Sequence, residues 1–206
     1  IIGSKGIQMD KIVIASGNKG KIREFQQIFT DFHIEVVPQT QFNVSNVEET
    51  GLTFVENAIL KARHATQQTQ LPALADDSGL EVDALKGAPG IYSARFAGEG
   101  ASDQNNNQLM LEKLQDIAES ERTARFQCII VFMRHAEDAT PLICQGTWEG
   151  RILTAPQGDN GFGYDPLFFV PTHDCSSAQL APEIKNQLSH RGQAIQLFKQ
   201  QVKKYL

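Results

Sequence analysis

A β-branched run at residues 11–15, followed by a glycine-bearing turn and a helical pattern, constrains the fold more than any other feature of the chain. The run reads KIVIA and the turn at residues 16–21 reads SGNKGK, after which Ile22, Phe25 and Phe29 recur at helical spacing. A strand that passes through a tight turn into a helix is a building unit of α/β proteins. We therefore expect the chain to open with a strand–turn–helix unit.

The rest of the chain alternates helices and strands at first and then pairs its strands. Strands are predicted at residues 34–39 and 72–76, with a helix at 53–69 between them. Two strand-like runs at 124–135 and 141–153 flank the polar turn AEDAT, which is typical of an antiparallel pair. Further helices are predicted at residues 102–117 and 189–206. This mixture predicts an α/β fold with mixed sheets.

Length, composition and charge limit the classes of protein. With 206 residues, 41% of them hydrophobic and 21% charged, the chain has the composition of a soluble globular protein of one large domain or two small lobes. A net charge of −5 argues against a nucleic-acid-binding protein, and no apolar run is long enough to span a membrane. Residues 1–8 precede Met9 and are expected to be a cloning remnant, outside a single folded domain of residues 9–206.

The cysteines offer no catalytic or metal motif. Cys128, Cys144 and Cys175 are odd in number and lack metal or redox spacing, which favours a reducing, cytoplasmic setting. The sequence also contains no G-x-S-x-G elbow, so covalent catalysis has little support.

The turn SGNKGK is the first candidate site. A strand, a glycine-bearing turn and a helix start present backbone N–H groups and the positive end of a helix dipole, which together can bind an anion. Lys19 and Lys21 add positive charge. A polar turn with solvated lysines explains the same residues equally well, because short glycine motifs are weak signals.

Four carboxylates form the second candidate site. Asp76 and Asp77 follow an apolar strand pattern, and Glu48 and Glu49 lie in an earlier polar loop. Ligands of open α/β sheets bind beyond the carboxyl ends of strands. Carboxylates near a phosphate would repel it unless a divalent cation such as Mg²⁺ lies between them. An Asx turn and a solvated loop are the alternative interpretations of the two pairs.

Two further segments suit the recognition of a base. Residues 161–166 read GFGYDP, and an aromatic residue between glycines can form a stacking platform. Residues 189–192 read SHRG at a helix start, where the dipole disfavours cations, so ligand contact is a fair inference. A hairpin turn and a solvated arginine remain the alternatives. Lys185 lies just upstream, while Asn57 and Lys61 share a helix face that ordinary polar exposure explains more simply.

Together these segments closely resemble the inosine triphosphate pyrophosphatase family, and within it the bacterial dITP/XTP pyrophosphatase branch. The resemblance extends from Lys11 to Val202 and rests on five blocks in the family's order and spacing. The blocks are SGNKGK, EETGLTFVENAILKA, ADDSGLEVDALKGAPGIYSAR, GFGYDPLF and SHRGQA. It implies an elongated, two-lobed α/β fold with a mixed sheet and a central active-site cleft, usually in a homodimer.

The resemblance also implies an activity and a cofactor. Members of this family hydrolyse non-standard purine nucleoside triphosphates (ITP, dITP, XTP) to the monophosphate and pyrophosphate with Mg²⁺, which cleanses the nucleotide pool. Two alternatives stay open: a nucleotide pyrophosphatase of other base specificity, and a nucleotide-binding regulator that does not turn over. An RNA-binding module is disfavoured by the acidic balance.

Residue by residue, the resemblance assigns roles to the matched positions. Asp77 would be the general base or a metal ligand, with Asp76 beside it, and Lys21 would neutralise the triphosphate. Glu49 and Glu48 would complete the Mg²⁺ site with Asp77. The predicted substrate-binding residues are Ser16, Gly17, Asn18, Lys19, Gly20, Lys21, Lys61, Ser78, Phe162, Gly163, Tyr164, Asp165, Lys185, His190 and Arg191.

Hydrogen bonds at position 6 of the purine could select the base. Hypoxanthine and xanthine present O6 as an acceptor, whereas adenine presents an amino group at the same position. Donors from His190, Arg191 and the backbone would therefore face the amino group of adenine, and unpaired buried polar groups discriminate strongly.

Overall fold

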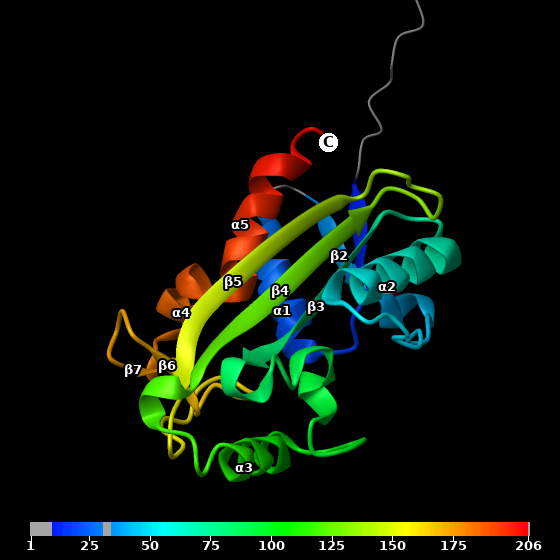
Figure 1. The fold of residues 1–206 in the computed structure, drawn as a ribbon. Coiled ribbons are helices and arrows are strands. Elements are labelled where there is room, and N and C mark those ends of the chain that lie inside the picture. Colours follow the sequence, from blue (N-terminus) through cyan, green and yellow to red (C-terminus); the bar gives the residue numbers. More distant parts are fainter. Residues whose placement is uncertain (1–9, 31–33, 206) are drawn as a thin grey trace, which may run out of the picture. The chain divides into compact units, whose positions relative to one another are not determined.

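The computed structural model describes residues 10–30 and 34–205, and the expected remnant at residues 1–8 lies outside them. Figure 1 shows the fold. The strands are β1 (Lys11–Ile14), β2 (Glu35–Pro38), β3 (Ala73–Val82), β4 (Thr123–Met133), β5 (Leu142–Ile152), β6 (Phe168–Val170) and β7 (Cys175–Ser176). The helices are α1 (Lys19–Phe29), α2 (Phe54–Thr69), α3 (Asp103–Lys113), α4 (Pro182–Leu188) and α5 (His190–Val202).

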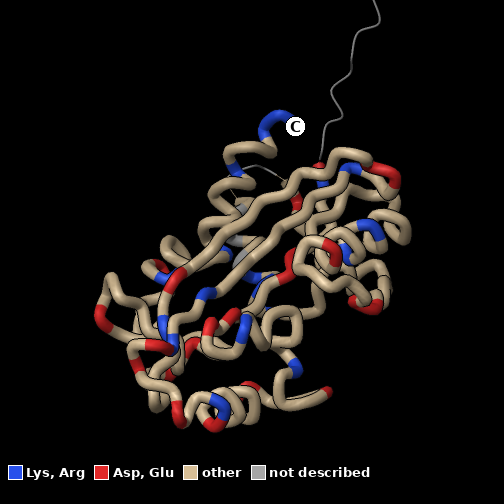
Figure 2. Tube along the Cα trace, viewed as in Figure 1, with Lys and Arg blue, Asp and Glu red and all other residues tan. Residues whose placement is uncertain are grey.

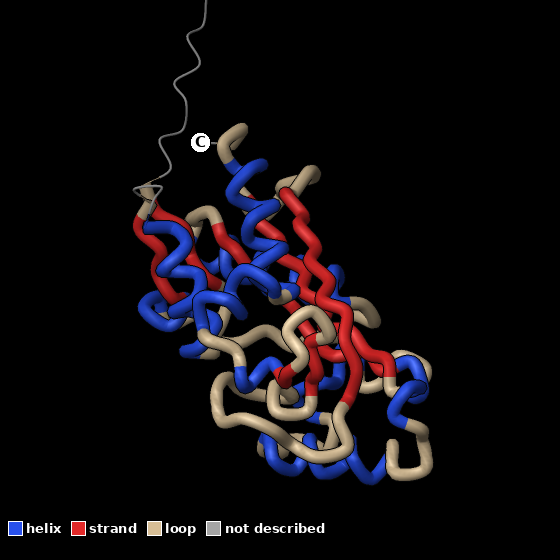
Figure 3. Tube along the Cα trace, turned by 90° about the vertical axis from the view of Figure 1, so that its left-hand side faces the viewer, coloured by secondary structure: helices blue, strands red, loops and turns tan. Residues whose placement is uncertain are grey.

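The strands form one mixed sheet in the order β2-β1-β3-β4-β5-β6-β7. β1 pairs in parallel with β2 and with β3, whereas β6 pairs antiparallel with β5 and with β7. Figure 3 shows the strands in red and the helices in blue, and the longest strands, β4 and β5, have 11 residues each. The predicted mixed α/β fold is therefore confirmed, and so is the opening unit of strand, turn and helix.

The chain divides into two compact units. Unit 1 comprises the chain up to Asp77, together with Ile129–Gln145 and the chain from Ala194 onward. Unit 2 comprises Ser78–Cys128 and Gly146–Gln193. β3, β4 and β5 each contribute residues to both units.

In unit 1 the helix α2 packs an alanine face on the sheet. Ala58, Ala62 and Ala65 recur at helical spacing and are fully buried. The sheet residues in the same cluster are Val13, Ala15, Ala73, Ala75, Ile129, Val131 and Met133. Within each segment these residues lie two positions apart, because side chains along a strand alternate between the two faces of the sheet.

Helices α1 and α5 cover the other face of the sheet in unit 1. Phe29 of α1 and Phe132 of β4 both contact Phe198 of α5, with ring centroids 5.4 and 5.8 Å apart. Because Phe132 lies between Val131 and Met133 in β4, strand alternation places it on the face opposite α2. Unit 1 is thus a sheet covered by helices on both faces.

The stretch ADDSG corrects one sequence-based prediction. It was expected to be a turn beyond the end of a strand, yet β3 continues through it as far as Val82. Leu80 and Val82, which follow the polar residues, are fully buried in unit 2, and the Ser93 hydroxyl accepts a hydrogen bond from Leu80 N at 2.8 Å. Burial of these apolar residues outweighs the turn propensity of Asp, Ser and Gly.

Aromatic rings form the core of unit 2. The Phe168 ring lies 4.6 Å from Phe126 and 5.1 Å from Trp148, measured between ring centroids. Helix α3 begins at the serine expected to cap it, because the Ser102 hydroxyl accepts a hydrogen bond from Asn105 N at 3.1 Å. These strands and this helix hold the loops that carry the candidate residues of unit 2.

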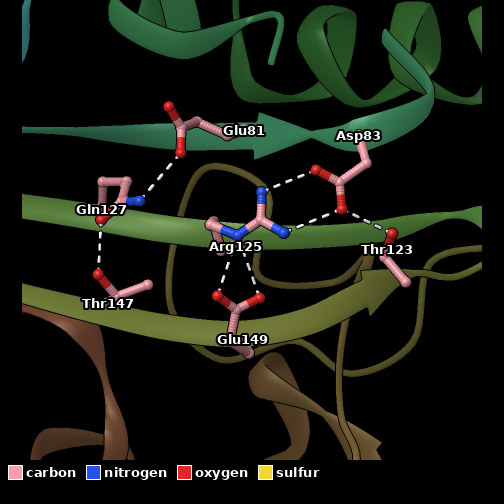
Figure 4. A network of polar contacts seen from close by, with 7 residues as sticks. All are labelled: Glu81, Asp83, Thr123, Arg125, Gln127, Thr147 and Glu149. Carbon is pink, nitrogen blue, oxygen red and sulfur yellow. Dashed lines mark hydrogen bonds and ion pairs between the residues drawn. The ribbon is translucent and has the colours of Figure 1, made fainter. Parts of the chain in front are cut away.

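A polar network crosses β3, β4 and β5 within unit 2 (Figure 4). Arg125 donates two hydrogen bonds to Asp83, at 2.8 and 2.9 Å, and two more from Nε to Glu149, at 3.0 and 3.1 Å. The other members are Glu81, Thr123, Gln127 and Thr147. Paired polar side chains on one face of a sheet stabilise the strand pairing.

This network makes a testable prediction about acid stability. Hydrogen bonds from Arg125 and Thr123 lower the pKa of Asp83 to about 2. Because this folded-state pKa lies below the unfolded value of about 3.9, the network stabilises the fold above that pH, and the contribution is lost as the pH falls toward about 2. In Arg125→Met, an NMR titration should show the Asp83 pKa moving up toward its ordinary value. An unchanged pKa would contradict this assignment.

Charges are mixed along the chain. Positive and negative positions are interspersed along the trace in Figure 2, in keeping with the modest net charge of −5. Within the part of the chain that the structure describes, none of the helices combines the length and the apolar character needed to cross a membrane.

Candidate active site

Strand alternation separates the two adjacent aspartates at the end of the first chain segment of unit 1. Asp77 follows Ala73 and Ala75 on the face that α2 covers, and Asp76 follows Leu74 on the opposite face. Both residues are nearly buried, with 3% of Asp76 and 7% of Asp77 exposed. Two buried like charges are therefore carried on one strand without sharing one environment.

Each aspartate has its own lysine. Lys21, from the first turn of α1, lies 2.8 Å from Asp76 Oδ2. Lys61, from α2, lies 3.0 Å from Asp77 Oδ1. Buried charges are retained in proteins where they are paired, so helices on opposite faces of the sheet balance the two carboxylates separately.

The first turn of α1 is closed by its own cap. Asn18 Oδ1 accepts hydrogen bonds from Gly20 N at 2.9 Å and from Lys21 N at 3.2 Å. Asn18 N in turn donates to Ser16 Oγ at 3.1 Å. Two backbone N–H groups that were predicted to bind an anion, those of Gly20 and Lys21, are thus already hydrogen-bonded to Asn18. A phosphate at this turn would rely on Lys19 and Lys21, or would displace the Asn18 side chain.

Lys61 joins two of the predicted carboxylates. Its Nζ atom lies 2.9 Å from Glu49 Oε1 as well as 3.0 Å from Asp77 Oδ1. Glu48, the other glutamate of the loop, is exposed. Among the described residues, no group of three or more His, Cys, Asp or Glu side chains is arranged to hold a metal ion. Lys61 therefore brings Glu49 and Asp77 together, whereas the Glu48 side chain is exposed to solvent.

The pKa of Asp77 is raised above its ordinary value, so its protonated form is more favoured in the protein than in water. Burial raises the pKa of Asp77 above its ordinary value, and Glu49 adds to this rise, while Lys61 and Lys21 oppose it. Burial tends to lower the pKa of Lys61, but Asp77, Asp76 and Glu49 outweigh it and keep the pKa raised. A carboxylate with a raised pKa beside a permanently charged lysine is typical of a general base.

The chemistry of these donors suits a hard divalent cation. The two carboxylates Glu49 and Asp77 share one ammonium group, that of Lys61, which leaves one net negative charge. Asp77 Oδ2 is buried and has no hydrogen-bond partner among the described residues. A carboxylate oxygen in that state is a ready ligand for Mg²⁺, which prefers one or two carboxylates completed by water and phosphate oxygens.

In unit 2 the loop at residues 161–165 is organised by Asp165. This side chain is 3% exposed and accepts hydrogen bonds from Phe162 N at 2.8 Å, from Ser177 Oγ at 2.7 Å and from Lys185 Nζ at 2.5 Å. A Cβ atom on Gly161 would lie only 2.0 Å from Asp165 Oδ2, so the close approach requires glycine. The buried Asp165 side chain therefore fixes the conformation of the loop by its hydrogen bonds.

The same loop presents an aromatic ring with two cations above it. Phe162 is 43% exposed. Lys185 Nζ lies 5.3 Å and the guanidinium carbon of Arg191 5.9 Å from its ring centroid, within the range of cation–π attraction. An exposed aromatic face flanked by donors can stack a base and hydrogen-bond its edge.

His190 and Arg191 stand at the start of α5 in unit 2. The His190 ring is stacked on Phe126 at 4.7 Å and is 8% exposed. Arg191 Nη2 donates to Ser78 Oγ at 3.2 Å. Ser189 Oγ accepts a hydrogen bond from Gly192 N at 3.1 Å, as expected for a helix cap.

Tyr164 is placed differently from its predicted neighbours. It is buried in the core of unit 2, and its hydroxyl donates to Ser93 O at 2.7 Å. Burial raises the pKa of its hydroxyl far above the ordinary value. Tyr164 therefore supports the loop, whereas Phe162 is presented to solvent.

Several supporting residues were not predicted from the sequence. Asp103 and Asn107 of α3 hold Gly163 by its N–H, at 2.7 Å, and by its carbonyl, at 2.8 Å. Asn57 of α2 was expected on an ordinary exposed polar face, but it is 1% exposed and accepts a hydrogen bond from Gly51 N at 2.8 Å. These side chains bond to the backbone of distant segments, and such contacts leave no local motif in the sequence.

Comparisons with known proteins agree on one family. The model of the Ham1 family matches residues 12–201. A Vibrio parahaemolyticus protein named dITP/XTP pyrophosphatase is 63% identical over 193 residues, which cover 93% of this chain and 96% of the relative. An Escherichia coli protein of the same name is 57% identical over 190 residues, covering 92% of this chain and 96% of the relative.

Solved structures agree as well. A HAM1 protein of Coxiella burnetii matches with a TM-score of 0.90 and 51% identity, covering 95% of this chain and 100% of that one. The Ham1 protein of Staphylococcus aureus matches with a TM-score of 0.86 and 45% identity over the same shares.

Proposed function

This chain belongs to the Ham1 family, and we propose that it hydrolyses non-standard purine nucleoside triphosphates (ITP, dITP and XTP) to the monophosphate and pyrophosphate. The name dITP/XTP pyrophosphatase, carried by relatives about as long as this chain, supports the substrate class. The observation in the structure that carries the proposal is the cluster of Lys61, Glu49 and Asp77, because it combines a base of raised pKa with charges suited to a phosphate.

We assign the proton transfer to Asp77. Water attacks the α-phosphorus, the bond from that phosphorus to the bridging oxygen breaks, and pyrophosphate leaves with the bonding electrons. The Asp77 carboxylate, which Lys61 contacts at Oδ1, accepts the proton of the attacking water. Lys21 and Lys19 offset the negative charge that grows on the leaving pyrophosphate.

Glu49 and Asp77 would hold Mg²⁺, with Glu48 as a further ligand if its loop adjusts. When bound, the ion supplies Lewis-acid stabilisation of the phosphate oxygens. Lys61 keeps Glu49 and Asp77 near each other without it, since one ammonium group contacts both carboxylates.

Unit 2 supplies the groups for the nucleoside. Phe162 offers a stacking face, and Lys185, His190, Arg191 and Ser78 offer polar contacts around a base. Donors at O6 would select hypoxanthine and xanthine over adenine, because the adenine amino group would leave buried donors unpaired.

Phe162→Ala tests the stacking role. Loss of stacking on one base is worth roughly 1–3 kcal/mol, so we expect KM for ITP to rise about ten-fold with little change in kcat. Tyr92→Ala is the matched control, because Tyr92 is another exposed aromatic residue of unit 2, 51% exposed, that lies outside the proposed pocket. Equal effects of the two substitutions on KM would contradict the role of Phe162.

The proposed setting follows from the substrate. An enzyme that cleanses the nucleotide pool acts in the cytoplasm, where that pool is. We also propose a homodimer, as the sequence resemblance implies, and size-exclusion chromatography with light scattering measures it directly.

The site of bond cleavage tests the proposed reaction. ITP is hydrolysed in isotopically labelled water with Mg²⁺, and the products are analysed by mass spectrometry. We expect inosine monophosphate that carries the label, and unlabelled pyrophosphate. Release of orthophosphate and a diphosphate, or no turnover on any nucleoside triphosphate, would overturn the proposal.

A further inference from the structure

The loop that carries Glu49 is held against α2 at two points. Glu49 itself contacts Lys61, and two residues later Gly51 N donates to Asn57 Oδ1 at 2.8 Å. Asn57 precedes Lys61 by four residues, so both side chains project from one face of α2. One face of α2 thus contacts both the Glu49 side chain and the Gly51 backbone of the loop.

The second contact is buried. Asn57 is 1% exposed, and its Nδ2 atom has no hydrogen-bond partner among the residues that the structure describes. A buried donor without a partner is unfavourable. An apolar side chain would avoid this penalty, so the useful part of Asn57 is its oxygen, which holds the loop.

Gly51 is required for this contact. A Cβ atom at position 51 would lie 2.6 Å from Asn57 Oδ1 and 2.6 Å from Glu56 Cβ, closer than such atoms approach in proteins. Helix capping does not need Asn57, because Thr53 Oγ1 accepts from Glu56 N at 3.3 Å and Glu56 Oε2 accepts from Leu52 N at 2.9 Å. The contact between Asn57 and Gly51 is therefore additional to the cap.

We propose that Asn57 is a positioning residue that sets the place of Glu49 through the backbone of Gly51. With Gly51 N–H held by Asn57, only Thr50 lies between this contact and Glu49, so the carboxylate cannot move far from Lys61 and Asp77. The inference rests on the proposed function, in which Glu49 and Asp77 bind Mg²⁺. Supporting residues behind metal ligands typically change metal affinity by about 10–100-fold when they are removed.

The test uses two variants that break one contact from opposite sides. Asn57→Ala removes the acceptor, and Gly51→Ala places a Cβ atom against Asn57 Oδ1, which prevents the approach without removing a polar side chain. Asn106→Ala is the control, because Asn106 is also buried, at 3% exposed, and also bonds a backbone N–H, that of Ala97 at 2.8 Å. The control loses a comparable buried amide without touching the Glu49 loop.

Two measurements are made on the ligand-free protein. Amide hydrogen exchange at residue 51 should become about ten-fold faster or more in Asn57→Ala and stay unchanged in Asn106→Ala. Titration calorimetry with Mg²⁺ should show about ten-fold weaker binding in both loop variants. The double variant should bind no more weakly than the weaker single variant, since both break the same contact.

Unchanged Mg²⁺ affinity in both loop variants would overturn the inference, and so would additive losses in the double variant. A failure of the proposed function is seen separately, as absence of Mg²⁺-dependent pyrophosphate release by the unmodified protein. Activity adds a final comparison: kcat lost in Asn57→Ala should return in part at raised Mg²⁺, which a general loss of folding would not allow.

Discussion

Asp77→Asn should lower kcat for ITP by about a thousand-fold, because a positioned general base contributes roughly 10²–10⁴-fold. The amide keeps the shape of the carboxylate but cannot accept the proton of the attacking water. The fold should persist, as judged by circular dichroism, because the substitution is nearly isosteric. The rate is measured as pyrophosphate release at saturating ITP and Mg²⁺.

The pH profile of kcat tests whether Asp77 is the base. The carboxylate works only when it is deprotonated, so kcat should fall as the pH drops through the pKa that Asp77 has in the complex with Mg²⁺ and substrate. Asp77→Asn should remove this acidic limb from its residual activity. Asp83→Asn is the control, since Asp83 lies in the polar network of unit 2. If Asp77→Asn keeps near-normal turnover with the same limb, Asp77 is not the base.

Lys21→Met should reduce both activity and stability. The substitution keeps an unbranched side chain but removes the ammonium group 2.8 Å from Asp76, whose side chain is only 1% exposed. Removing one partner of a buried ion pair costs about 3–5 kcal/mol, and Lys21 is 17% exposed, so we expect a loss near the lower end of that range. The loss is measured by urea denaturation, and kcat/KM should fall about a hundred-fold.

A second substitution separates the two effects. In Lys21→Met/Asp76→Asn the buried carboxylate is also neutralised, so most of the lost stability should return. Activity should stay low, because the cation that faces the triphosphate is still missing. Recovery of activity together with stability would show that Lys21 acts only by supporting Asp76.

Local patterns predicted most of the elements. The β-branched run before SGNKGK became β1, and the periodic Phe25 and Phe29 became the buried face of α1. Ser102 caps α3 as expected. These features depend on neighbours within one or two turns of the chain, and such interactions can be read from sequence.

The arrangement of Asp76 and Asp77 could not be predicted in the same way. Two adjacent carboxylates after an apolar run suggested one shared site on a loop. The structure continues β3 through them, so alternation sends them to opposite faces. Their partners, Lys21 and Lys61, come from helices that precede them by many residues. Only the packing of those helices on the sheet determines which lysine meets which carboxylate.

The turn SGNKGK was also only partly predictable. It lies between β1 and α1 as predicted, but the Asn18 side chain accepts hydrogen bonds from two of the N–H groups of the first helical turn. Asparagine is a common helix cap, and that signal was present in the sequence. In unit 2, the exposure of Phe162 and the burial of Tyr164 depend on the backbone path of a glycine-rich loop, which residue types alone do not determine.

The central claim is selective hydrolysis of non-standard purine nucleoside triphosphates, and the ratio of kcat/KM for ITP to that for ATP tests it most directly. Both substrates are assayed with the same preparation, by pyrophosphate release in the presence of Mg²⁺. If donors in unit 2 read O6 of the base, the ratio should be about a hundred or more. Comparable values for ITP and ATP would contradict the account.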